Sequence, residues 1–183
     1  LLLYGMIIGK TNLTVMKESL FFKTLPDEYH GLKIIHISDI HLGSFSDTVY
    51  LSRAVDLINQ ESPDIILFSG DLINIHSSEA IPYISIFKRL KAKFGEYSVL
   101  GNHDISDYRK FDSIKAGQND IRTLVQFQQQ MGFVLLRDSA VIIQGKKSNI
   151  AILGVDNWGL PPFKKSGNLK KAVEYSANSD FKI

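Results

Sequence analysis

Three short stretches, Ser38-Asp39-Ile40-His41, Gly70-Asp71 and Gly101-Asn102-His103-Asp104, decide the fold of this 183-residue chain. Each stretch directly follows a short run rich in Val, Ile and Leu, and such runs are typical of buried strands. Asp71 follows Asp39 by 71 − 39 = 32 residues, and Asn102 follows Asp71 by 102 − 71 = 31, about one strand–helix unit each. The spacing therefore predicts parallel strands joined by right-handed helical crossovers.

Hydrophobic spacing and helix caps predict the remaining elements. Strands are expected at 33–38, 64–68, 97–100, 133–136, 140–143 and 150–155, with an edge strand at 14–22 and a further strand that opens at Phe181. Helices are expected at 48–62, 77–95, 121–131 and 169–177, and a long irregular loop at 104–120. The last three complete strands are expected to form a β-meander attached to the α/β part.

The side chains that follow the strands can hold metal ions, because the carboxyl ends of parallel strands meet at one sheet edge. Asp39 and His41 can reach one ion if the backbone turns, which Gly43 would ease. Asp71 is the best candidate to bridge two ions, and Asn102 offers a carbonyl oxygen to the second. Nitrogen and oxygen ligands without sulfur favour Mn, Fe or Zn. The competing interpretation is that Asp and Asn only cap helices and turns.

His103 is expected to act on the substrate rather than on a metal. It can serve as a general acid or as a positive charge on the transition state, and Asp104 can orient it and keep it protonated. The nucleophile would be hydroxide held between the two ions. The sequence therefore predicts phosphoryl chemistry, with His103 and Asp104 as the catalytic pair.

The three motifs together resemble the calcineurin-like metallophosphoesterases, over roughly residues 30 to 183. The sequence from His36 to Gly43, together with Gly154-Val155-Asp156-Asn157-Trp158, resembles that of a bacterial membrane-associated branch of predicted phosphohydrolases. The resemblance implies an α/β fold, a four-layer α/β/β/α sandwich with a dinuclear centre. It also implies that Asp39, His41 and Asp71 hold one ion, that Asp71 and Asn102 hold part of the other, and that His103 is the catalytic histidine that binds no metal.

The sequence departs from this family because no histidine follows His103. The family closes its site with a further histidine motif and a Gly-His-x-His segment. We therefore expect this chain to be an amino-terminal part of a longer enzyme, incomplete at its C-terminus, that holds at most one ion weakly and is inactive by itself. Residues 32–183 are expected to form the phosphoesterase domain, after an apolar and edge-strand segment with a linker at 1–31.

The apolar start of the chain, from Leu1 to Ile8, is too short to cross a bilayer, which needs about 20 residues. It is expected to be either a first strand or the end of an anchor that lies upstream of Leu1. In the second case the domain would be membrane-associated, with the extracytoplasmic side favoured over the cytoplasmic face. The expected substrate is a small-molecule or lipid-linked phosphoester, either a monoester or a diester.

The amino-acid composition limits the functions that the chain can have. The net charge of +2 and the absence of a Lys/Arg cluster argue against nucleic acid, although the fold also occurs in nucleases. The chain has no cysteine, which excludes thiolate metal sites and cysteine nucleophiles. A non-catalytic metal-binding or scaffold module of the same fold stays an alternative.

Four further residues are weighed separately. His36 is expected to be a packed strand residue, His76 a solvated loop histidine and His30 a linker residue without a role. Trp158 is expected either to line the substrate cleft or to anchor a packed loop.

Overall fold

The computed structural model describes residues 12–105, 110–159 and 165–183. The strands are β1 (Ile34–Ile37), β2 (Ile65–Phe68), β3 (Glu96–Ser98), β4 (Val134–Leu135), β5 (Ser139–Gln144), β6 (Asn149–Gly154) and β7 (Phe181–Lys182). The helices are α2 (Val49–Gln60), α3 (Ile84–Phe87), α4 (Asn102–Ile105), α5 (Ile114–Gln130) and α6 (Leu169–Glu174), with 3-10 helices η2 (Asp27–Tyr29), η3 (Leu42–Ser44) and η4 (Ser77–Tyr83).

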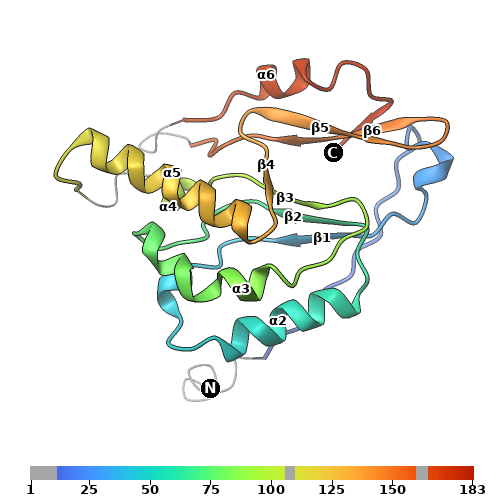
Figure 1. Ribbon diagram of the computed structural model, residues 1–183. Helices are drawn as coiled ribbons and strands as arrows, with labels where there is room; N and C mark the ends of the chain where they lie inside the picture. Colours follow the sequence, from blue (N-terminus) through green and yellow to red (C-terminus); the bar gives the residue numbers. More distant parts are fainter. Residues whose placement is uncertain (1–11, 106–109, 160–164) are drawn as a thin grey trace.

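Within the described residues the strands form two sheets. The first has the order β1-β2-β3-β4 with all pairs parallel, and the second has the order β5-β6-β7. In the second sheet β5 and β6 form an antiparallel hairpin, and β7 runs parallel to β6. Figure 1 shows α2, α3 and α5 on the outer side of the first sheet and α6 on the outer side of the second. This order of layers confirms the predicted α/β/β/α sandwich.

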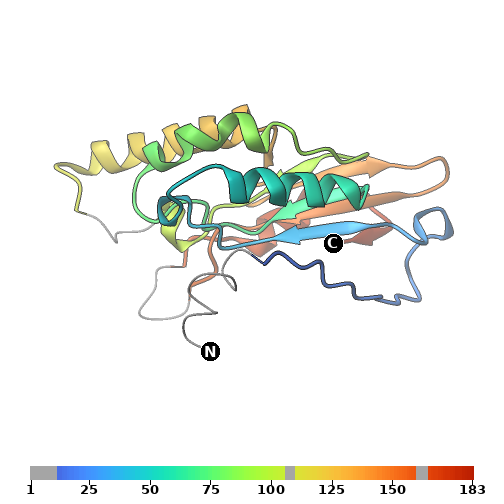
Figure 2. The same cartoon turned by 90° about the horizontal axis from the view of Figure 1, so that it is seen from below.

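Strand β2 shows why the layers stack in this way. Side chains alternate between the two faces of a strand, and β2 is apolar on both. Ile66 and Phe68 pack into a core with the helices, whereas Ile65 and Leu67 pack into a second core with Ile150 and other residues of the second sheet. Strand β2 is therefore covered on both faces. Seen from below, α2, α3 and α5 lie roughly side by side in front of the strands (Figure 2).

The structure corrects the prediction of a three-stranded meander. Strand β4 pairs with β3, so the chain after α5 makes another parallel crossover, and only β5 and β6 form a hairpin. The predicted loop at 104–120 is also wrong in its second half. Helix α5 begins at Ile114, because the Ser113 side chain accepts a hydrogen bond from the Ala116 N–H and caps it.

Two other expected elements differ. The helix expected at 77–95 begins as the 3-10 helix η4, which contains Pro82, and continues only through the short α3. The edge strand expected at 14–22 is absent, since these described residues have no strand pairing. The apolar start at Leu1–Ile8 lies outside the described residues. No helix in the described part of the chain is both long enough and apolar enough to cross a membrane.

The linker before β1 is held against the β5–β6 hairpin by hydrogen bonds. Glu28 accepts hydrogen bonds from the backbone N–H groups of Lys146, Lys147 and Ser148 and from the Ser148 hydroxyl. The buried Tyr29 donates its hydroxyl proton to a carbonyl at the base of the same hairpin. The Ser148 hydroxyl and the backbone donors lower the pKa of Glu28 from 4.5 to about 2.

This arrangement predicts a pH-dependent effect of Glu28→Gln. A carboxyl whose pKa falls on folding stabilises the fold above its unfolded pKa, and this contribution is lost as the pH falls through the folded pKa. The variant should therefore melt below the wild type at pH 7, and the gap should close between about pH 4.5 and 2. Thermal unfolding followed by circular dichroism measures it, with the exposed Glu18→Gln as control. A difference in melting temperature that does not change with pH would contradict the stabilising role of the Glu28 carboxylate.

Candidate metal centre

The loops after β1 and β2 run side by side at the carboxyl edge of the first sheet. Beyond the strands, the Asp39 N–H donates to the Gly70 carbonyl and the His41 N–H to the Asp71 carbonyl, both at 3.1 Å. Asp39, His41 and Asp71 have positive φ angles of 53°, 51° and 59°. Left-handed backbone costs about 1–3 kcal/mol at a residue other than glycine, and such strain concentrates at functional sites. The turn that was expected from Gly43 is made by the candidate ligands themselves.

The loops after β2 and β3 meet at two glycines. A Cβ on Gly70 would lie 2.3 Å from the Gly101 nitrogen, and a Cβ on Gly101 would lie 2.2 Å from Asp71 Oδ1. Side chains at these positions would separate the loops. The glycine of each motif is therefore required by the close approach of two backbones.

Asp104 joins the same two loops through its buried carboxylate. One oxygen accepts from the N–H groups of Asp71 and Gly101, and the other from those of Leu72 and Ile73. Burial raises the pKa of Asp104 to about 7 against the effect of these donors, and the neighbouring Asp71 carboxylate adds to the increase. Asp104 thus fixes the backbone of the site.

The structure gives His103 a different orienting partner from the expected one. His103 Nδ1 lies 2.9 Å from the Asn74 carbonyl oxygen, which can only accept, so Nδ1 carries a proton and donates it. The imidazole then offers Nε2 to a metal ion or a substrate. The predicted orienting role of Asp104 is therefore wrong, because its oxygens hold backbone N–H groups and the carbonyl of Asn74 takes that position.

Glu79 holds the loop that carries this carbonyl. Its carboxylate accepts from the N–H groups of Asn74, Ile75 and His76 at 2.7–3.0 Å. Gly43 allows the contact, since a Cβ there would lie 2.5 Å from Glu79 Oε2. Glu79 was not among the residues predicted from sequence, although its position three residues after His76, which precedes η4, is that of the acidic residue in a capping box.

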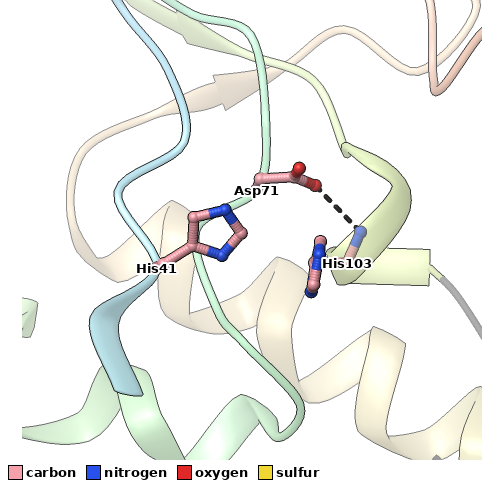
Figure 3. A group of neighbouring side chains, drawn as sticks. All are labelled: His41, Asp71 and His103. Atoms are coloured by element: carbon pink, nitrogen blue, oxygen red, sulfur yellow. Dashed lines mark hydrogen bonds between the residues drawn. The ribbon is translucent and has the colours of Figure 1, made fainter. Parts of the chain in front are cut away.

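His41, Asp71 and His103 come together as a possible metal site. Each offers one ligand atom, and these atoms lie within 4.8 Å of one another. Figure 3 shows the three side chains facing a common space, with the His103 N–H donating to Asp71 Oδ1 at 2.8 Å. Asp39 Oδ1 lies 3.9 Å from His41 Nε2. Asn102 lines the same cleft as Asp39 and Asp71.

The chemistry of these residues suits a divalent cation. The Asp71 carboxylate is buried, and the described part of the chain gives it no lysine or arginine partner. Buried negative charge needs compensation, and a bound cation supplies it. Imidazole and carboxylate ligands in a sulfur-free site suit Mn, Fe or Zn.

A cleft of about 500 Å³ opens beside this site, between the ends of β1 to β3 and the segment after β6. Asp156 supports its wall: Oδ1 accepts from the Leu100 N–H, and Oδ2 is held by Arg137 at 2.8 Å. Trp158 lines the cleft and is half exposed, with the Lys165 ammonium 3.4 Å from its ring centroid. Of the two expectations for Trp158, the structure supports the cleft wall.

The remaining histidines lie outside the group. His36 is exposed, and its Nε2 lies 2.7 Å from Ser69 Oγ, so the expectation of a packed strand residue is wrong. It lies on β1 at the edge of the sheet, where the second sheet does not cover it. His76 is a half-buried loop residue, and His30 lies 3.6 Å from Asp27 in the linker.

Comparison with known proteins assigns the chain to a family. The calcineurin-like phosphoesterase family matches residues 32–170. The chain belongs to this family.

Its relatives are larger proteins. A zebrafish (Danio rerio) transmembrane protein with metallophosphoesterase domain is 30% identical over 57% of this chain and 24% of its own length. The Bacillus subtilis metallophosphoesterase YkuE is 34% identical over 46% of this chain and 30% of its own length. The UDP-2,3-diacylglucosamine pyrophosphatase LpxG of Chlamydia trachomatis is 34% identical over 43% and 24%. The chain spans less than a third of the length of these relatives.

Among solved structures, the phosphopantetheinyl hydrolase PptH of Mycobacterium tuberculosis is similar, with a TM-score of 0.45 and 17% identity. The match covers 67% of this chain and 42% of that one.

The contact between the two glycines predicts an unequal effect of alanine substitutions. Gly70 and Gly132 both have φ near +105°, but only Gly70 has neighbours within 4 Å of an added Cβ. Gly70→Ala should lower the free energy of unfolding by about 3 kcal/mol, from backbone strain plus the clash, whereas Gly132→Ala should cost about 1 kcal/mol. Urea unfolding of both variants measures the difference. Equal losses would show that the close approach is unimportant.

The anchoring of the Asn74 carbonyl predicts that Glu79→Ala loosens His103. Three N–H groups lose a charged acceptor, so stability should fall by about 1–3 kcal/mol. The Nδ1 proton of His103 should also exchange faster with solvent in NMR spectra. Glu79→Gln should have a smaller effect, since it keeps one acceptor oxygen, and the exposed Glu174→Ala should have none. Unchanged exchange of the His103 proton in Glu79→Ala would contradict the proposed anchoring.

Proposed function

We propose that this chain supplies the amino-terminal half of the active site of a metal-dependent phosphohydrolase, whose reaction is the hydrolysis of a phosphomonoester or phosphodiester. The observation that carries the proposal is the convergence of His41, Asp71 and His103, within 4.8 Å, from the loops after three parallel strands. Membership of the calcineurin-like phosphoesterase family supports it.

The proposed metal centre combines His41 with three side chains that line the cleft, those of Asp39, Asp71 and Asn102. Asp39, His41 and Asp71 hold one divalent ion, and Asp71 and Asn102 provide part of the second site. When bound, the ions activate water and neutralise charge on the phosphoryl oxygens. Asp71 suits the bridging position, because its main chain and its carboxylate are both fixed by hydrogen bonds. This chain by itself is proposed to hold at most one ion, weakly, and to be inactive.

His103 is the proposed general acid. Its Nδ1 is committed to the Asn74 carbonyl, so Nε2 is the nitrogen that acts on the substrate. As water adds to phosphorus and the ester P–O bond breaks, a proton from Nε2 passes to the leaving oxygen. Asp104 contributes only by holding the loops, which makes it a positioning residue.

The proposed substrate is a small-molecule or lipid-linked phosphoester. The relative LpxG is named for a pyrophosphatase activity on UDP-2,3-diacylglucosamine, a lipid-bearing substrate. Two relatives are named transmembrane proteins, which supports the proposal that the whole protein is membrane-associated.

Nucleic acid is a less suitable substrate for this cleft. None of the described residues that line it is lysine or arginine. Proteins that bind DNA or RNA use basic side chains on the phosphate backbone, which makes affinity strongly salt-dependent. A scaffold role without turnover would leave the fixed orientation of His103 without a purpose.

Substitutions in the complete protein separate the roles of Asp71 and His103. Asp71→Ala should lose metal at both positions, since its carboxylate serves both ions. His103→Ala should keep the metals and slow hydrolysis of an activated aryl phosphodiester with Mn²⁺ by about 10²–10⁴-fold, the usual contribution of a general acid. Elemental analysis and steady-state kinetics measure these effects.

His30→Ala is the matched control, because His30 lies in the linker and should change neither metal content nor rate. If His103→Ala loses its metals while Asp71→Ala keeps them, the roles are assigned wrongly. If the complete protein shows no metal-dependent hydrolysis of any phosphoester tested, the scaffold alternative holds.

A further inference from the structure

A second hollow lies beside the metal centre and differs from the cleft in its chemistry. It has a volume of about 280 Å³ and is lined by residues from the loop after β2, from α4 and from the first turns of α5. His103 borders this hollow, while the preceding Asn102 borders the metal cleft. The hollow therefore begins at the residue that is proposed to protonate the leaving group.

Five of the eleven described residues that line the hollow have apolar side chains, and the others are polar residues and one glycine. Its apolar side chains are Ile75, Ile105, Phe111, Ile114 and Ile121. Gly117 lets the Phe111 ring approach α5, since an added Cβ would lie 3.1 Å from that ring. The isoleucine side chains and the ring thus come from three segments that pack around one space.

Two of these isoleucines are unusually exposed for their type. Ile75 is 47% exposed and Ile114 is 84% exposed. Exposed apolar side chains that are grouped around a hollow typically mark a binding site, whereas single ones need no explanation. Two separate segments contribute them, because Ile75 follows β2 and Ile114 begins α5.

Charge at the hollow disfavours an anionic occupant. None of the described residues that line it is lysine or arginine. Its acidic residues are engaged, since Asp104 holds four backbone N–H groups and Asp120 accepts from the Ser77 N–H and hydroxyl. Among the described residues, the lining offers no cation for a second phosphate or a carboxylate, and its five apolar side chains favour an occupant that buries hydrocarbon.

We infer that this hollow binds the apolar part of the leaving alcohol, and that Ile75 and Ile114 select phosphoesters of hydrophobic alcohols. The inference rests on the proposed function, because it takes His103 as the residue that faces the leaving oxygen. A water molecule occupies about 30 Å³ in the liquid, so the hollow has room for a group of roughly six to nine carbon-sized units. A short alkyl chain or one aromatic ring fits this size, and the remainder of a longer chain would extend past Ile114.

Alkylphosphonates test the inference by binding alone, because their C–P bond is not cleaved by ester hydrolysis. The probes are methyl-, butyl- and hexylphosphonate, titrated by calorimetry into the complete protein in the presence of Mn²⁺. Affinity should rise about threefold for each added methylene, as expected for burial of hydrocarbon. Affinity that does not depend on chain length would overturn the inference.

Substitutions test whether Ile75 and Ile114 cause this dependence of affinity on chain length. Ile114→Glu and Ile75→Asp should abolish most of the chain-length dependence and leave the affinity for methylphosphonate within about twofold. Ile81→Glu is the matched control, because Ile81 is 56% exposed on the neighbouring η4 and does not line the hollow. The inference is wrong if Ile81→Glu removes the dependence as completely as Ile114→Glu, or if none of the substitutions affects it.

Hydrolysis of methyl phosphate and hexyl phosphate, in which the alcohol is the leaving group, separates this inference from the proposed function when phosphate release is measured. Loss of all metal-dependent hydrolysis concerns the proposed function alone. Normal hydrolysis with equal kcat/KM for the two esters in wild type and Ile114→Glu would overturn the hollow as a specificity site and leave the phosphohydrolase assignment intact.

Discussion

The buried carboxylate of Asp104 is the interaction on which the site depends. It binds four backbone N–H groups from the loops after β2 and β3, and so brings Gly70 against Gly101. That contact in turn places the Asp71 carboxylate against the N–H of His103. An unpaired buried charge would be costly, but one that accepts four hydrogen bonds fixes its donors strongly. The candidate ligands are therefore held by main-chain geometry before any ion binds.

Hydrogen bonds between the loops also explain why residues with strained backbone are tolerated here. Asp39, His41 and Asp71 have left-handed backbone, and hydrogen bonds between the two loops hold it in place. A flexible loop would relax this strain and separate the side chains. The stability needed to maintain it comes from the first sheet, whose strand β2 is packed on both faces. In this way an ordinary sandwich core supports a site with little freedom.

Much of this arrangement could be predicted from sequence, and the failures have physical causes. The apolar runs that precede each motif predicted three parallel strands, and their common edge predicted which side chains meet. The pairing of β4 was predicted wrongly, because its two residues are too few to show a periodicity that would distinguish a parallel crossover from a meander. The partner of His103 was missed because Asn74 acts through its backbone carbonyl, which no side-chain pattern reveals. Glu79 and the hollow beside α5 depend on contacts between distant segments, which local spacing cannot predict.

We propose that this edge of the sheet is a metal centre built around Asp71. Anomalous diffraction from crystals of the complete protein grown with Mn²⁺ would locate the ion. We expect an anomalous peak about 2.0–2.3 Å from an Asp71 carboxylate oxygen and from a ring nitrogen of His41, the usual range for such ligands. A Mn²⁺ peak elsewhere in the molecule, with none within bonding distance of Asp71, would contradict it.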